Sequence, residues 1–233
     1  MSEHQHGHVH GHGPAHGHDA DISDEQELGA EFWNERYASA PAIWSGQPNP
    51  QLIAEASRLT PGRALDVGAG EGADAIWLAE HGWTVTAVDI SAIAMERAAE
   101  HARAAGDDVA TRISFEERDF TTWAPPVGSF DLVSAQFVHV PPARRDALNA
   151  ALAAAVAPGG ILLIVGHHPL DLETGLRRPS RADLLFTAED VVGVLDPAEW
   201  EILATEARPR TATGPDGADV GVHDAVLLAR RRP

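Results

Sequence analysis

The sequence predicts an α/β fold: a doubly wound, mainly parallel, seven-stranded sheet with an antiparallel edge strand. Three observations support this prediction. Short β-rich apolar segments alternate with helical segments, a glycine-rich turn follows the first strand, and two strand-like segments end the chain without a helix between them. Strands joined through helices must cross over and run parallel, whereas consecutive strands can pair antiparallel.

The expected elements follow one another without an internal repeat. Strands are expected at residues 63–68, 84–89, 112–117, 130–136, 161–165, 201–205 and 224–229, and helices at 73–81, 93–105, 143–156 and 188–195. Pro158-Gly159-Gly160 is expected to form the turn before the fifth strand. The long irregular segment 170–180 is a candidate substrate loop.

Composition narrows the classes of protein. With 233 residues, of which 44% are hydrophobic, the chain can form one large domain with a full core. No apolar stretch approaches the length of a membrane helix and no signal peptide is evident, so a soluble cytoplasmic protein is expected. The absence of cysteine excludes disulfides and thiolate chemistry. A net charge of −18 disfavours a nucleic-acid partner, and basic residues that are all arginine are typical of a GC-rich bacterial genome.

The amino-terminal segment differs from the rest of the chain. Residues 1–25 alternate histidine with glycine and then become acidic, a composition typical of a disordered tail. Such a His-rich tail could hold a transition-metal ion, or it could be passive. Residues 26–233 are expected to form the folded domain, divided into a covering segment, 26–58, and a core, 59–233.

The glycine-rich turn is the strongest local signal. Residues 64–73 read Ala-Leu-Asp-Val-Gly-Ala-Gly-Glu-Gly-Ala at the junction of a strand and a helix. Glycines there let a ligand approach the backbone closely, and the pattern also fits a relaxed dinucleotide-binding fingerprint. Asp89 ends the second strand, where a carboxylate can accept hydrogen bonds from both ribose hydroxyls or cap the next helix.

Together these motifs resemble the class I S-adenosylmethionine-dependent methyltransferases. The family's motifs are matched at Asp66, Gly68, Gly70, Gly72, Asp89, Asp119, Phe120, Phe130-Asp131-Leu132-Val133 and Pro158-Gly159-Gly160. The resemblance implies S-adenosyl-L-methionine as cofactor, with the glycine loop and Asp66 around its methionine and ribose portion and Asp89 on the ribose. It also implies that Asp119 meets the adenine amine and that Phe120 packs on the ring. Ile90 and Gln136, at the ends of their strands, are further candidate cofactor residues.

An aromatic cluster precedes the core. It comprises Phe32-Trp33, Tyr37 and Trp44 and is followed by Gly46, Pro48 and Pro50. This spacing resembles the amino-terminal segment of the thiopurine and tellurite-resistance type methyltransferases, which covers the cofactor. The resemblance makes Trp44 the leading candidate for a lid residue, while simple packing of the aromatics on the sheet is the alternative.

Histidines follow two of the strands that should border the acceptor. His167 and His168 end the fifth strand and His139 lies beyond the fourth, so each could remove a proton from an acceptor or orient it. The expected activity is methyl transfer to a small-molecule thiol, hydroxyl or similar nucleophile. The alternatives are a protein that binds S-adenosylmethionine or metal without turnover, and a methyltransferase for protein or nucleic acid.

Overall fold

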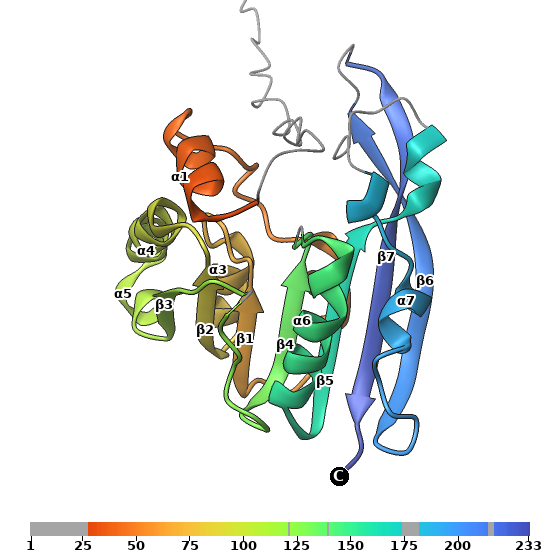
Figure 1. Ribbon diagram of the computed structural model, residues 1–233. Helices are drawn as coiled ribbons and strands as arrows, with labels where there is room; N and C mark the ends of the chain where they lie inside the picture. Colours follow the sequence, from red (N-terminus) through yellow and green to blue (C-terminus); the bar gives the residue numbers. More distant parts are fainter. Residues whose placement is uncertain (1–27, 121, 139, 174–181, 214–216) are drawn as a thin grey trace, which may run out of the picture.

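The computed structural model describes residues 28–120, 122–138, 140–173, 182–213 and 217–233 (Figure 1). Its single sheet has seven strands in the order β3-β2-β1-β4-β5-β7-β6. The first five strands are parallel to one another, and β7 is antiparallel to both β5 and β6. The predicted doubly wound fold with an antiparallel pair at one edge is therefore confirmed, with the reversed strand next to the edge and β6 outermost.

Seven of the eleven predicted elements begin and end within one residue of their expected bounds. The strands are β1 (Arg63–Val67), β2 (Thr84–Asp89), β3 (Ile113–Glu117), β4 (Phe130–Gln136), β5 (Val156–His167), β6 (Trp200–Thr213) and β7 (Asp219–Arg231). The helices are α1 (Ala30–Ala38), α2 (Pro50–Ala56), α3 (Ala73–Glu80), α4 (Ala92–Ala105), α5 (Asp107–Ala110), α6 (Pro142–Ala155) and α7 (Ala188–Val192), with 3₁₀ turns η1 (Pro169–Glu173) and η2 (Ala182–Leu184). Among these described residues, no helix has both the length and the apolar character needed to span a membrane.

Alternation along the strands divides the core into two layers. On β5, Leu162 and Ile164 pack with α6 and α7, whereas Leu163 and Val165 pack with α2, α3 and α4. Figure 1 shows α6 and α7 on the near face of the sheet. Because neighbouring side chains point to opposite faces, a residue's position along its strand decides which layer it joins.

The carboxyl-terminal half differs from the sequence prediction in three places. The final strands are 14 and 13 residues long rather than about six, because β6 and β7 pair along their whole length as an antiparallel hairpin. The residues Pro158-Gly159-Gly160 lie inside β5, at an irregularity of its pairing with β4, and not in a separate turn. Helix α7 ends at Val192, three residues earlier than expected, and its start is fixed by a capping box of Thr187 and Asp190.

Candidate functional site

The glycine loop joins β1 to α3 in a backbone conformation that suits glycine. Gly68, Gly70 and Gly72 have φ angles of 71°, 54° and 88°. A Cβ on Gly72 would lie 2.8 Å from the Cβ of Ala98 in α4, and one on Gly70 would lie 3.0 Å from the Tyr37 hydroxyl. These glycines therefore allow both the tight turn and the close approach of two helices, in addition to any ligand contact.

Asp89 joins the loop to the end of β2. Its carboxylate accepts hydrogen bonds from the N–H of Gly70 at 2.9 Å and from the N–H of Ser91 at 2.9 Å. The Ser91 hydroxyl accepts from Ala94 and caps α4, so Asp89 is not needed for that cap. The carboxylate is thereby fixed at the carboxyl edge of the sheet, beside the loop.

Three carboxylates surround this edge: Asp66 and Asp89 are buried and Asp74 is half-buried. Burial raises the pKa of Asp66, and the negative charges of Asp74 and Asp89 raise it further. Burial also raises the pKa of Asp74 to about 6, although a hydrogen bond from the Asn49 N–H opposes the shift. Burial raises the pKa of Asp89 against N–H bonds from Ser91, Gly70 and Ile90. The site concentrates negative charge that a cation would relieve.

Two buried oxygens at the ends of adjacent strands accept no hydrogen bond within the described part of the chain. They are Oδ2 of Asp66, on β1, and Oε1 of Gln136, on β4. The two strands are neighbours and Asp66 pairs with Ser134, so both side chains lie at the same edge and on the same face. Buried acceptors without donors are costly, and a bound ligand can supply the donors.

The remaining predicted cofactor residues lie at the same edge of the sheet. Ile90 directly follows Asp89, and the N–H of Arg118 donates to the Asp89 carbonyl at 2.8 Å, which places Asp119 next to that point. Asp119 is exposed, and Phe120 is partly buried against the core layer of α6. The fold thus brings these residues to one edge.

The aromatic segment reaches the glycine loop. The indole N–H of Trp44 donates to the Tyr37 hydroxyl at 2.9 Å, and both side chains lie against Gly70. Burial and the charge of Asp89 raise the pKa of Tyr37, which keeps the phenol protonated. Figure 1 shows α1 above this edge of the sheet, beside α4.

Glu71 holds the aromatic segment to the loop, a role that the sequence analysis missed. Its buried carboxylate accepts from the N–H groups of Ile43 and Trp44, each at 3.1 Å. Arg97 on α4 pairs with the same carboxylate at 2.9 Å and donates to the Ala40 carbonyl at 2.8 Å. The signal for this role was an acidic residue inside a loop that was expected to face a ligand. Such a carboxylate needs a nearby cation and backbone N–H donors to stabilise it.

On the acceptor side, Phe137 directly follows β4 with a φ angle of 53°, an uncommon conformation for a residue with a side chain. The Phe137 ring lies 4.5 Å from the ring of buried His167. The guanidinium of Arg210 lies 5.8 Å from the Phe137 ring. Arg210 in turn pairs with fully buried Asp224 at 2.8 Å, and Gln51 of α2 donates to the same carboxylate at 3.2 Å. The β6–β7 hairpin therefore forms a wall beside the ends of β4 and β5.

His168 directly follows β5, whose last residue is His167, so alternation along the strand predicts that the two side chains lie on opposite faces. Its ring centroid lies 6.4 Å from that of His223, and its Nδ1 accepts from the N–H of Leu170 at 3.1 Å. His223 lies 3.4 Å from the buried carboxylate of Asp171. His139 lies outside the described residues.

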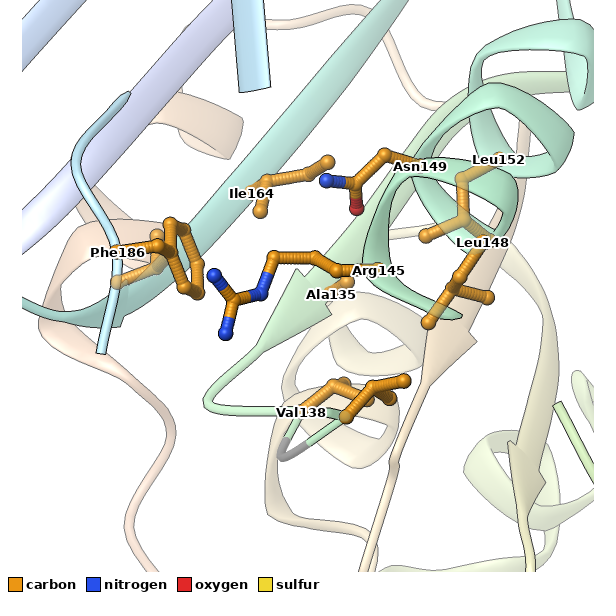
Figure 2. Close-up of a pocket in the computed structure, with 10 residues that line it drawn as sticks. Ala135, Val138, Arg145, Leu148, Asn149, Leu152, Ile164 and Phe186 are labelled. Atoms are coloured by element: carbon orange, nitrogen blue, oxygen red, sulfur yellow. The ribbon is translucent and has the colours of Figure 1, made fainter. Parts of the chain in front are cut away.

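Two cavities within the described structure lie away from the glycine loop. The one in Figure 2 is about 20 Å³, room for one water, and lies between α6 and the sheet, with Arg145 directed toward Phe186. The other is about 220 Å³ and lies between α6 and the start of β6, beside Trp200 and Arg231. Among described residues, no group of three or more potential ligands is close enough to hold a metal, and the His-rich tail lies outside them. A cofactor would therefore use the open carboxyl edge.

Comparison with known proteins agrees with this geometry. Residues 64–160 match the family described as a methyltransferase domain. The chain is 28% identical over 134 residues to 2-heptyl-1-hydroxyquinolin-4(1H)-one methyltransferase of Mycobacteroides abscessus, an alignment that covers 56% of this chain and 58% of that relative. It is 29% identical over 182 residues to thiocyanate methyltransferase 1 of Brassica oleracea, covering 76% of each.

Structural similarity extends over more of the chain. The crystal structure of TehB from Haemophilus influenzae superposes with a TM-score of 0.64 at 19% identity, covering 87% of this chain and 67% of that one, a likeness of fold. The matched residues include the glycine loop, Asp89 and the Pro158-Gly159-Gly160 segment that carried the resemblance. Residues 64–160 therefore form a methyltransferase domain, and the chain has sequence similarity to methyltransferases and the fold of S-adenosylmethionine-dependent methyltransferases.

Proposed function

We propose that this protein transfers the methyl group of S-adenosylmethionine to a small-molecule thiol, hydroxyl or similar nucleophile. The observation that carries the proposal is the set of three carboxylates beside the glycine loop: buried Asp66 and Asp89 and half-buried Asp74. S-adenosylmethionine has a sulfonium and an ammonium, both positive, and no phosphate. A dinucleotide would bring its negative diphosphate to the same carboxylates, and Coulomb repulsion disfavours that ligand.

The residues at the edge fit the parts of this cofactor. Asp89 is fixed by the N–H groups of Gly70 and Ser91 at the position expected for the ribose hydroxyls. Asp66 Oδ2 and Gln136 Oε1 are buried acceptors suited to the ammonium or to a hydroxyl. Asp119 and Phe120 stand beyond β3 for the adenine, and Trp44 covers the loop from the other side.

When bound, the cofactor supplies an activated methyl group, so the protein needs mainly to orient the two reactants and exclude water. The glycine loop and Asp89 orient the cofactor, and the segment held by Glu71 shields the loop from solvent. The wall formed by the β6–β7 hairpin, whose Arg210 lies over the ring of Phe137, stands beside the ends of β4 and β5, where an acceptor would approach.

A small acceptor is favoured over a macromolecule on two grounds. The relatives are named for methylating a hydroxyquinolone and thiocyanate, both small molecules. The net charge of −18 also opposes a nucleic-acid substrate. Binding of S-adenosylmethionine without turnover remains the competing function, and only an assay of turnover separates the two.

The test combines binding and turnover. Titration calorimetry should detect S-adenosylmethionine and S-adenosylhomocysteine and no NAD, and incubation with a panel of thiols, hydroxyls and thiocyanate should produce S-adenosylhomocysteine. Asp89→Ala should weaken cofactor binding by about 1–3 kcal/mol. Gly82→Ala places a substitution at a positive φ of 90°, remote from the loop. This variant is the control for a change outside the site and should bind the cofactor normally. Binding of NAD in place of S-adenosylmethionine would refute the proposal.

A further inference from the structure

The start of β7 carries a histidine whose surroundings differ from those of His167 and His168. His223 lies on β7 next to the end of β5, because the N–H of His168 donates to the His223 carbonyl at 3.2 Å. Its strand neighbours Val222 and Asp224 are fully buried on the opposite face, while its own side chain is 33% exposed. The imidazole therefore stands at the open end of the layer formed with α6 and α7.

A buried carboxylate lies beside this imidazole. Asp171, on η1, is fully buried, and its Oδ1 accepts from the backbone N–H of His223 at 2.8 Å. The same oxygen lies 3.4 Å from Nδ1 of His223, a buried nitrogen that makes no hydrogen bond among the described residues, so the carboxylate acts on it through its charge. The carboxylate therefore favours the tautomer with the proton on Nδ1, which leaves the lone pair on Nε2.

The turn of η1 creates this pair. The N–H of Asp171 donates to the His168 carbonyl at 3.0 Å, and this bond turns the chain back so that Asp171 lies under β7. In the same turn Nδ1 of His168 accepts from the N–H of Leu170, which places the proton of a neutral His168 on Nε2. His168 consequently has no uncommitted lone pair, and His223 has one.

We infer that His223 is the group that removes the proton from the acceptor and that Asp171 is its positioning residue. The inference rests on the proposed function and narrows its substrate class: the acceptor is a thiol or hydroxyl that is protonated at neutral pH, not a preformed anion. Only β5 separates β4 from β7, so two strand spacings, about 10 Å, lie between them across the sheet, and His223 lies about another 10 Å beyond the level of Gln136 along the strands. His223 is therefore about 14 Å from the end of β4, and an acceptor above the ends of these strands would lie between the two.

The chemistry balances with groups already named. The S–H or O–H bond of the acceptor breaks, its proton goes to Nε2 of His223, and its electron pair stays on the acceptor atom. That pair forms the bond to the methyl carbon as the carbon–sulfur bond of the sulfonium breaks and returns its electrons to sulfur. The positive charge lost from the sulfonium then resides on the imidazolium, which the Asp171 carboxylate stabilises.

A first test reads the tautomers without any turnover. Long-range ¹H–¹⁵N spectra of the full chain labelled at histidine should show His223 as the Nδ1–H form, with its signal assigned by its loss in His223→Asn. The Asp171→Asn variant presents an amide that can donate to Nδ1, so it should shift His223 toward the Nε2–H form. An Nε2–H tautomer of His223 in the wild type would overturn the inference.

A second test compares two acceptors. With an aliphatic thiol, protonated at neutral pH, His223→Asn should lower kcat by about 10²–10⁴, the usual contribution of a placed base. With thiocyanate or an acidic aromatic thiol, already ionised, the same variant should lose less than about threefold, because no proton has to leave. His81→Asn, on an exposed imidazole stacked on Trp77, is the control for the substitution itself and should match wild type with both acceptors.

The outcomes separate the inference from the function beneath it. Full activity of His223→Asn with the aliphatic thiol, or an equal loss with both acceptors, would overturn the inference while methyl transfer by the wild type stands. A large loss in His168→Asn with none in His223→Asn would do the same. Absence of S-adenosylhomocysteine from the wild type with every acceptor would overturn the proposed function and the inference together.

Discussion

The two halves of the sheet differ in the kinds of residue that form their candidate binding surfaces. On the side of β1, β2 and β3, positive-φ glycines and buried carboxylates form a site whose parts come from short, adjacent strand–helix units. On the side of β5, β6 and β7, the wall formed by the β6–β7 hairpin is joined to α2 by residues far apart in the chain, Gln51 and Asp224. The comparison teaches that local geometry builds the cofactor side and long-range pairing builds the acceptor side.

The largest effect should come from crowding the glycine loop. Gly72→Val adds side-chain atoms where even a Cβ would lie 2.8 Å from the Cβ of Ala98 and 3.2 Å from its Cα, at a φ of 88°. Strain and overpacking together should cost about 4 kcal/mol of unfolding free energy. Urea denaturation measures the loss, with Gly82→Ala as the control. A loss below about 1 kcal/mol would show that α3 and α4 can separate easily.

The next effect should come from the acceptor half. Arg210→Met leaves the buried Asp224 carboxylate without its cation, although Gln51 still donates to it, and should cost about 3 kcal/mol. The double variant Arg210→Met, Asp224→Asn removes the unpaired charge and should recover most of that loss. Equal stability of the single and double variants would mean that Asp224 gains solvent when the pair is broken.

The pH dependence of the unfolding free energy should report on the cofactor side of the sheet, where Asp74 lies. Asp74 has a folded pKa of about 6 against an ordinary 3.8, so the folded protein binds more protons than the unfolded chain between these values. Stability should therefore fall as pH rises through that window, by at most about 3 kcal/mol from this group. Asp74→Asn should flatten the profile, and thermal melts from pH 4 to 7.5 measure both.

The stabilisation of the protein by S-adenosylmethionine should have the opposite pH dependence, because the same carboxylates surround the cofactor site. A cationic ligand favours the ionised forms of Asp66, Asp74 and Asp89, so the increase in Tm caused by S-adenosylmethionine should grow as pH rises through 6. A pH-independent increase in Tm would contradict the role given to these charges.

The smallest effect should follow from loosening the aromatic segment. Glu71→Gln weakens the pair with Arg97 and one of the bonds to the Ile43 and Trp44 amides, and should cost about 1–2 kcal/mol. Hydrogen exchange should accelerate at these amides and in α1, while the amides of β5 keep their protection. Faster exchange throughout the sheet would show that the segment is part of the global folding unit.

Local signals explain how much of the fold the sequence predicted. β2 and β4 begin and end at the predicted residues, because β-rich apolar runs stop there at polar residues such as Asp89. The final strands were predicted too short, since the outer parts of β6 and β7 are polar and exposed and are ordered mainly by pairing with each other. Propensity does not contain that information, because strand stability depends on the partner.

The same division holds for the candidate site. The sequence by itself predicted the methyltransferase domain and placed the glycine loop, Asp66 and Asp89, because a tight turn and the end of a strand are properties of a few consecutive residues. Only the tertiary structure decided that Glu71 holds the aromatic segment. It also decided that Asp171 lies against His223, 52 positions away in the chain. Pairing β5 with β7 brings those two residues together, because it places His223 beside the turn that carries Asp171.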